Sequence, residues 1–325
     1  MLAATYRRYG PPDVIRIEEV ARPRPKAGEV LVHVRASTVT SGDVRMRAFK
    51  GAGIFWLPMR LLFGVFRPRN PIPGMEFAGT VVEIGKGVTR FRVGDAVFGM
   101  KIGGANAEFL TIRENAAIAA KPEALTFEAA AATPFGALSA LDFLRDFVRI
   151  KPGQRILIHG ASGAVGVFAV QLAKHFGAHV TAVCSTTNCD LVAALGADRV
   201  IAYTDVDYTQ GPDIFDAILD TVGVTSFSRC KRVLAQTGRH VFVVQTLIQL
   251  LQAIWTSMRP GKRVVVGFSG GDSMDDLLLI KSLIDSGKIK PVTDRTYRLQ
   301  EIAEAHRFVD TGRKRGAVVV SIGSP

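Results

Sequence analysis

A short apolar run followed at once by three regularly spaced glycines constrains this chain more than any other feature. Residues 155–159 read RILIH, which is typical of a buried strand, and a helical pattern follows over residues 165–176. Gly160 and Gly163 lie between the strand and the helix, and Gly166 lies in the first turn of the helix. Glycine allows a tight turn and close approach of a phosphate, while a helix N-terminus offers free N–H groups and a positive dipole. We therefore predict a dinucleotide pyrophosphate site here, in preference to a purely structural turn.

The residues around this motif alternate between strand and helix patterns. Further strands are predicted at residues 179–184, 200–201, 214–220 and 240–244, and a second helix at residues 189–195. Such alternation builds a doubly wound parallel sheet, the Rossmann arrangement, in an α/β protein. The N-terminal part instead shows short strands at residues 30–34, 79–84 and 93–99 with Gly and Pro between them, which indicates a small β-barrel-type domain. Helical periodicity appears from residue 126, and the tail has strand-like ends, 264–266 and 318–321, around a helix at 300–309.

The end of the second Rossmann strand predicts the choice of dinucleotide. Sites that prefer NAD place Asp or Glu there to bind the ribose 2′-hydroxyl. This chain has Ser185, Thr186, Thr187 and Asn188, and its first carboxylate is Asp190. Neutral side chains tolerate a 2′-phosphate that a carboxylate would repel, so NADPH (NADP) is the expected cofactor. Because no basic residue stands at these four positions, the strictness of that preference stays open.

Composition excludes several classes of protein. Cys184, Cys189 and Cys230 are neither in a C-x-x-C spacing nor near a histidine in ligand register, so we expect reduced thiols and no metal ligation. The formal net charge of +12 comes from scattered Lys and Arg without interleaved aromatic residues, so no specific nucleic acid is expected as a partner. The sequence contains neither a secretory signal pattern nor a long apolar span, which predicts a cytoplasmic location.

Several further stretches are informative: YGPPDVIRIEEVARPRPKAGEVLVHV near the start, PIPGMEFAGTVVEIGKGVTRFRVGDAVFG, LGADRVIAYTDVDY, DAILDTVG, and GKIKPVTDRTYRLQEIAEAHRFVDTGRKRGAVVV towards the end. Together with the glycine motif, they resemble the medium-chain dehydrogenase/reductase superfamily, in particular its zinc-free, zeta-crystallin-like quinone oxidoreductase branch. The resemblance implies a GroES-like catalytic domain formed by residues 1–123 and 263–325. It implies a Rossmann NADP-binding domain at residues 124–262, inserted between these two parts.

The chain departs from the zinc-dependent members of the superfamily at both ligand motifs. Those members carry Cys-x-x-Asp and Gly-His-Glu, where this chain has Thr40-Ser41-Gly42-Asp43 and Gly74-Met75-Glu76. Threonine and methionine are not credible Zn²⁺ ligands, and the four-cysteine structural zinc lobe is absent from the sequence as well. We therefore expect that no metal is bound. We expect instead that hydride is transferred to an acceptor that needs little activation.

The resemblance also implies roles for individual residues. Ser162, Gly163, Ala164 and Val165 would hold the pyrophosphate, and Ser185 and Asn188 would meet the 2′-phosphate. Tyr203 would lie against the adenine, Arg315 near the ribose and Ser139 beneath the nicotinamide, with Thr221, Val243 and Phe268 at strand ends facing the cofactor. Thr40, Asp43 and Arg45 are the candidates for the substrate end, although Asp43 is also placed to cap the following helix.

Two apolar segments complete the set of candidates. Residues 54–66 lie where the family has its substrate loop, and Phe55, Trp56, Phe63 and Phe66 would line a pocket for a large apolar acceptor. The expected partner is a small-molecule substrate that is apolar and electron-poor. Residues 247–258 form a second apolar run. Ordinary burial, a homodimer interface and a weak peripheral membrane contact are open alternatives for these segments.

The function predicted from the sequence is an NADPH-dependent, zinc-independent reduction of a quinone or an enone. An enoyl-thioester reductase is the alternative enzyme. A non-catalytic, NADPH-loaded protein that binds membrane or RNA is the alternative from another class. We expect a homodimer.

Overall fold

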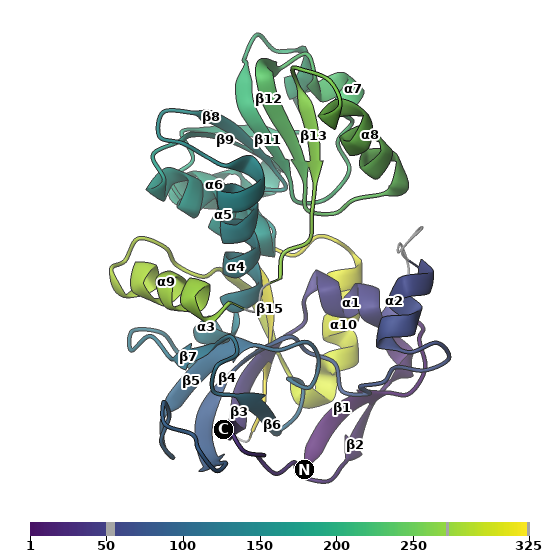
Figure 1. The fold of residues 1–325 in the computed structure, drawn as a ribbon, viewed down its shortest axis with the longest axis vertical. Helices are drawn as coiled ribbons and strands as arrows, with labels where there is room; N and C mark the ends of the chain where they lie inside the picture. The colour runs from purple at the N-terminus through teal and green to yellow at the C-terminus, as the bar shows by residue number, and fades with distance from the viewer. Residues whose placement is uncertain (50–55, 271–272, 324–325) are drawn as a thin grey trace. The chain divides into compact units, whose positions relative to one another are not determined.

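A computed structural model of the chain describes residues 1–49, 56–270 and 273–323 (Figure 1). The chain divides into two compact units. Unit 1 combines Met1–Phe135 with Gly271–Pro325, and unit 2 is Gly136–Gly270. The divisions thus fall at 135/136 and 270/271, whereas the sequence placed them at 123/124 and 262/263. The helix at 127–131 contacts strands of unit 1, and the strand at 263–266 pairs within the sheet of unit 2, which accounts for both differences.

Unit 2 is built on a parallel sheet in the order β10-β9-β8-β11-β12-β13. Numbered along the chain, this is the 3-2-1-4-5-6 order of a dinucleotide-binding fold, with its switch point between β8 and β11. Apolar residues dominate the central strands, as expected for a sheet covered on both faces. The strands are β8 (Arg155–His159), β9 (His179–Cys184), β10 (Arg199–Ala202), β11 (Phe215–Asp220), β12 (Leu234–Phe242) and β13 (Arg263–Val266).

Helices lie on both sides of this sheet in Figure 1, with α5 and α6 on one side and α7 and α8 on the other. α5 contacts β8 and β9, α6 contacts β9 and β10, and α8 contacts β13. Most of α5 is buried, including Val167, Phe168 and Leu172. The helices of this unit are α4 (Pro134–Asp142, beginning in unit 1), a π-helical segment (Phe143–Val148), α5 (Ala164–His175), α6 (Cys189–Ala194), α7 (Phe227–Cys230) and α8 (Leu247–Ser257).

Unit 1 contains a mainly antiparallel sheet in the order β14-β15-β3-β4-β5-β7, with β6 also paired to β3, and a separate β1-β2 hairpin. The pairing of β15 with β3 joins Val319 to Thr38 and Val320 to Ser37, so segments from both parts of the chain share one sheet. The strands are β1 (Leu2–Tyr6), β2 (Ile15–Glu19), β3 (Glu29–Thr38), β4 (Glu76–Ile84), β5 (Ala96–Met100), β6 (Phe109–Arg113), β7 (Ile118–Ala120), β14 (Thr293–Arg298) and β15 (Ala317–Ser321).

The core of unit 1 lies between this sheet and the helices that pack on it. Val32, Phe77, Val97 and Val320 are fully buried in one apolar cluster, which α10 joins through Ile302 and Ala305. The helices are α1 (Ser41–Ala48), α2 (Trp56–Phe63), α3 (Phe127–Ala131), α9 (Met274–Asp285) and α10 (Ile302–Asp310). Short 3-10 turns at Pro12–Val14 and Leu299–Glu301 precede β2 and α10.

The predicted fold class is confirmed, with a parallel doubly wound unit and a GroES-like unit of β-strands. Strands β8 and β9 have the predicted bounds, and helix α5 begins one residue before the predicted position. Of the helices that the structure describes, none has both the length and the apolar character needed to cross a membrane.

Candidate functional site

The predicted phosphate loop forms a tight turn from the end of β8 into α5. Gly160 has a φ of +79°, and a Cβ there would lie 2.5 Å from Thr221 Oγ1. A Cβ on Gly166 would lie 2.2 Å from the carbonyl oxygen of Gly160, so only glycine permits this approach of helix to strand. A Cβ on Gly163 would instead meet only the Gly160 carbonyl, at 3.4 Å, and otherwise open space. Packing therefore requires glycine at positions 160 and 166, whereas Gly163 leaves room beside the helix N-terminus.

That open space fits a dinucleotide pyrophosphate. Gly163 is the N-cap of α5 and no side chain caps this helix end. The first N–H groups of any α-helix lack intrahelical carbonyl partners, so those of Ala164, Val165 and Gly166 are available to an anion. The residues that would hold the pyrophosphate are therefore in a suitable local geometry.

The loop after β9 is linked to this turn. Asn188 is buried and its Nδ2 donates to Ser162 Oγ at 3.0 Å, which joins two residues predicted for the same cofactor. Ser185 Oγ lies 3.2 Å from Thr187 Oγ1. Thr186 Oγ1 contacts Thr204 and also donates to Asp205 Oδ2 at 3.4 Å. Asp205, which the sequence analysis did not select, thus brings a carboxylate next to the segment predicted to read the 2′-phosphate.

A buried polar network at the end of β11 fixes the neighbouring loop. Asp220 is fully buried, and its carboxylate accepts from the backbone N–H groups of Val222, Gly223 and Thr225 at 2.7–2.8 Å. Thr225 Oγ1 also donates to Asp220 Oδ2 at 2.6 Å and lies 2.8 Å from His240 Nε2. Burial lowers the pKa of His240 to about 4, so this ring is neutral at physiological pH. The motif DAILDTVG contains Asp220 but neither Thr225 nor His240, so it did not reveal which side chains this network joins.

The other residues predicted for the cofactor occupy varied surroundings. Thr221 Oγ1 donates to the carbonyl oxygens of His159 at 2.9 Å and Gly160 at 3.2 Å, and so holds the turn. Val243 directly follows β12, and its N–H donates to Asp220 O at 2.9 Å. Three others lie elsewhere in unit 2: Ser139 is buried in α4, while Tyr203 and Phe268 are exposed. Arg315 belongs to unit 1, where it is exposed and its N–H donates to Asp294. Their contacts with a cofactor stay predictions.

The two substitutions at the zinc-ligand positions lie next to each other in unit 1. Thr40 Oγ1 is 3.8 Å from Met75 Sδ and donates to Asp43 Oδ2 at 2.7 Å. The N–H of Asp43 donates back to Thr40 Oγ1 and the N–H of Thr40 donates to Asp43 Oδ2 at 2.8 Å, and these two backbone donors form a capping box at the start of α1. Asp43 Oδ1 also accepts from the N–H of Gly74 at 3.0 Å. The helix-capping interpretation of Asp43 is confirmed, and burial raises the pKa of this carboxyl to about 6.

Arg45 does not join Thr40 and Asp43 in any contact described, and it is exposed on α1. Of the predicted pocket residues, Phe55 lies outside the described residues. Trp56 begins helix α2, but its side chain also lies outside the description, and Phe63 is half-buried at the end of the same helix. Within the described ranges, His, Cys, Asp and Glu form no group of three that could hold a metal ion.

Glu76 is a buried carboxyl that the sequence analysis quoted but did not select. It is 2% exposed at the start of β4, where it accepts from Thr38 Oγ1 and, at 2.7 Å, from the N–H of Phe135. Burial raises the pKa of Glu76 to about 7, partly offset by these two donors. Burial lowers the pKa of Lys314 to about 8, and the charge of Glu76 opposes that shift. Unit 1 therefore contains a carboxyl and an amine whose pKa values are both shifted towards neutral pH.

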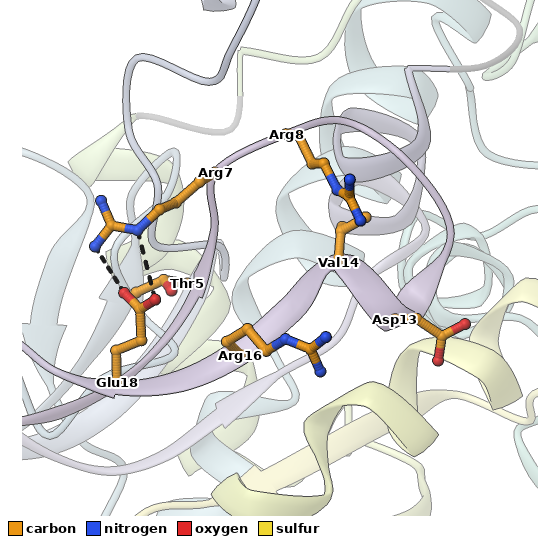
Figure 2. Close-up of a pocket in the computed structure, with 7 residues that line it drawn as sticks. All are labelled: Thr5, Arg7, Arg8, Asp13, Val14, Arg16 and Glu18. Atoms are coloured by element: carbon orange, nitrogen blue, oxygen red, sulfur yellow. Dashed lines mark hydrogen bonds and ion pairs between the residues drawn. The ribbon is translucent and has the colours of Figure 1, made fainter.

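A separate surface hollow lies on the β1-β2 hairpin (Figure 2). Arg7 Nη2 pairs with Glu18 Oε2 there at 2.7 Å, and Asp13 pairs with Arg307. None of the predicted site residues lines it. The lining residues are Thr5, Arg7, Arg8, Asp13, Val14, Arg16 and Glu18.

Comparisons with known proteins agree with this arrangement. The model of the alcohol dehydrogenase GroES-like domain matches residues 26–137, and that of the zinc-binding dehydrogenase matches residues 195–320. The chain is 31% identical to a chloroplastic quinone-oxidoreductase homolog of Spinacia oleracea, covering 98% of each chain. It is 30% identical to a chloroplastic NADPH-dependent alkenal/one oxidoreductase of Arabidopsis thaliana, covering 98% of this chain and 79% of the relative. The structure of the quinone oxidoreductase from Coxiella burnetii superposes with a TM-score of 0.87 at 27% identity, covering 99% of each chain.

The chain therefore belongs to the medium-chain dehydrogenase/reductase superfamily, within its quinone oxidoreductase branch. This membership makes it an oxidoreductase.

Substitution of two glycines should separate packing from ligand binding. We expect Gly163→Ala to leave the thermal unfolding temperature nearly unchanged, because its Cβ meets open space, yet to weaken dinucleotide binding by about tenfold or more by blocking phosphate approach. Gly166→Ala should instead destabilise unit 2, because its Cβ would overlap the Gly160 carbonyl. Thermal shift and a fluorescence titration with NADPH measure both effects. Full affinity in Gly163→Ala would show that the phosphates bind elsewhere.

The buried Glu76 should give unit 1 a distinctive pH dependence. Because its folded pKa of about 7 exceeds the ordinary value of 4.5, the folded state binds more protons than the unfolded state between these values, and stability falls as pH rises through this window. Glu76→Gln should remove the part of this fall that Glu76 causes, gaining on the order of 3 kcal/mol relative to wild type between pH 4.5 and 7.5, while the part due to Asp43 remains. Urea unfolding across pH measures it. The control is Glu83→Gln, an exposed residue of the same strand. Parallel curves for wild type and Glu76→Gln would contradict the assignment.

Proposed function

We propose that the protein is an NADPH-dependent reductase that transfers hydride to a quinone or an activated alkene without zinc. The observation that carries this proposal is the turn at Gly163, which leaves open space at the uncapped N-terminus of α5. A reduced nicotinamide supplies a hydride when bound. The named relatives, one a quinone-oxidoreductase homolog and one an NADPH-dependent alkenal/one oxidoreductase, support both acceptor classes.

The residues of unit 2 have two tasks under this proposal. The turn from Gly160 to Gly166 binds the pyrophosphate through backbone N–H groups, and the bond from Asn188 to Ser162 keeps that turn in register with the loop after β9. The network of Asp220, Thr225 and His240 fixes the loop that follows β11. Such preorganisation reduces the ordering cost of cofactor binding.

The preference for NADPH is proposed from the polar, uncharged segment Ser185–Asn188. A 2′-phosphate meets hydroxyl groups there instead of the carboxylate that NAD-preferring sites use. Asp205 opposes this preference, because its carboxylate accepts from Thr186 Oγ1. We therefore expect a moderate preference for NADPH.

The zinc-free mechanism is proposed from the chemistry of two side chains. Thr40 and Met75 replace the cysteine and histidine ligands of zinc-dependent relatives, and Thr40 Oγ1 is already engaged by Asp43. A neutral hydroxyl and a thioether are poor ligands for Zn²⁺. The acceptor must therefore be electron-poor enough to take a hydride without a Lewis acid, as quinones and enones are.

A substrate pocket at the segment 54–66 also remains a proposal. The part of this segment that the structure describes is apolar and open to solvent, with Leu61 and Leu62 more than half exposed and Phe66 92% exposed on the turn that follows α2. Apolar side chains of this size would favour a bulky, lipophilic acceptor.

The cofactor proposal predicts the effect of a single charge. Ser185→Asp should lower the affinity for NADPH by about tenfold or more and spare NADH, because the new carboxylate repels the 2′-phosphate. Ser185→Asn, similar in size but neutral, should keep the wild-type preference, and Asp205→Asn should strengthen it. Dissociation constants for both dinucleotides measure this. A wild type that binds NADH more tightly would contradict the proposal.

The proposed reaction is tested by NADPH oxidation with a panel of acceptors: a small and a bulky quinone, an enone, an enoyl thioester and an aldehyde. We expect turnover of quinones or enones, none of the aldehyde, and no loss of rate after dialysis against a chelator. Stoichiometric zinc whose removal abolishes activity would overturn the zinc-free mechanism. Turnover of the enoyl thioester alone would replace the proposed acceptor class.

A further inference from the structure

Two cysteines border the four residues that are proposed to face the 2′-phosphate of the cofactor. Cys184 is the last residue of β9 and Cys189 is the first residue of α6, so that only residues 185–188 separate them. The thiol of Cys184 donates to Cys189 Sγ, and the two sulfur atoms lie 3.9 Å apart. Both cysteines are free thiols. The sequence indicated reduced thiols, but it did not indicate that two of them are in contact.

The two thiols differ in their exposure to solvent. Cys184 is 2% exposed, and burial raises the pKa of its thiol to about 12, with a smaller contribution from the neighbouring Cys189. Cys189 is half-buried, and its thiol donates to the carbonyl oxygen of Ser185 at 3.7 Å. An oxidant in solution therefore reaches Cys189 first, while Cys184 lies beside it as a second thiol.

Cys184 is the fixed member of this pair. It is paired with Ala202 in the parallel sheet, and its carbonyl oxygen accepts from the N–H of Tyr203 at 3.0 Å. Helix α6 is short by comparison, and its buried residue is Val192. If the two sulfur atoms approach each other, the loop and Cys189 therefore move, because the strand is held by its neighbour.

We propose, on the basis of the proposed NADPH site, that Cys184 and Cys189 are a reversible oxidation site whose disulfide weakens cofactor binding. Hydrogen peroxide is the oxidant, and it converts the Cys189 thiol to a sulfenic acid while one water is released. The sulfur of Cys184 then attacks the Cys189 sulfur, the S–S bond forms, and the hydroxyl group leaves with the Cys184 proton as a second water. The two sulfur atoms together lose two electrons, which the peroxide gains.

This bond would change the loop between the two cysteines. A disulfide requires sulfur atoms about 2.05 Å apart, so the 3.9 Å contact must shorten by roughly 2 Å. Asn188 directly precedes Cys189, and its Nδ2 donates to Ser162 Oγ in the phosphate turn. Ser185 directly follows Cys184. Displacement of the loop therefore disturbs both the link to the phosphate turn and the hydroxyl groups that would meet the 2′-phosphate.

Treatment of the full chain with hydrogen peroxide tests the proposal, followed by a thiol-alkylating reagent and digestion with trypsin. Residues 175–199 form one tryptic peptide that contains both cysteines. After oxidation, this peptide should be lighter by two hydrogen atoms and should resist alkylation. The dissociation constant for NADPH should rise by about tenfold or more, because the donors to the 2′-phosphate are displaced, and dithiothreitol should restore it.

Two variants separate this pair from oxidation elsewhere. Cys189→Ser removes the half-buried thiol and should keep the affinity of the reduced wild type for NADPH both before and after peroxide. The matched control is Cys230→Ala, because this third cysteine is 0% exposed and its Sγ lies 3.6 Å from the hydroxyl oxygen of Tyr208. The control variant should respond to peroxide as wild type does.

Complete alkylation of the peptide after oxidation, or a disulfide that leaves the affinity for NADPH unchanged, would overturn the proposal. A loss of affinity that Cys189→Ser shares, or that dithiothreitol does not reverse, would overturn it as well. If the untreated, reduced protein does not bind NADPH, the proposed function is contradicted, and this control of cofactor binding is contradicted with it.

Discussion

The close approach of helix α5 to strand β8 is the contact on which the candidate dinucleotide site depends. The absence of a side chain at Gly166 lets the first turn of the helix rest against the carbonyl of Gly160, and this contact sets where the free N–H groups of the helix point. Asn188 and Thr221 then tie the same turn to the ends of β9 and β11 through Ser162 and the His159 carbonyl. Three neighbouring strands thus share one loop geometry, so an anion encounters donors that are already in place.

The sequence predicted this part well because its signals are local. An apolar run, a glycine turn and a helical period each involve consecutive residues. Strands β8 and β9 and helix α5 accordingly lie where they were expected. The first half of β12 and helix α9 were not predicted. Strand β12 contains the polar residues Gln236 and Thr237 followed by Gly238, and it shifts register against β11, so it shows no uniform strand pattern.

The missed parts of the candidate site depend on partners far apart in the chain. Asp220 reaches His240 only through Thr225, and Glu76 accepts from Thr38 and Phe135. The sequence indicated that Thr40 and Met75 replace metal ligands and that Asp43 caps the following helix, but it did not show that Thr40 is the residue with which Asp43 forms the cap. Side-chain hydrogen bonds of this kind are set by tertiary packing, and the hydrophobic periodicity of the sequence does not indicate them.

The pairing of β15 with β3 has a consequence for the order of folding during synthesis. All of unit 2 emerges from the ribosome before β15 does, so the parallel sheet can form while Ala36–Thr38 on β3 still lacks its antiparallel neighbour. An unpaired strand edge is a template for association with other chains. Unit 1 therefore spends the longest part of translation incomplete, and a nascent chain is most exposed to aggregation at the strand that later lies at the centre of its sheet.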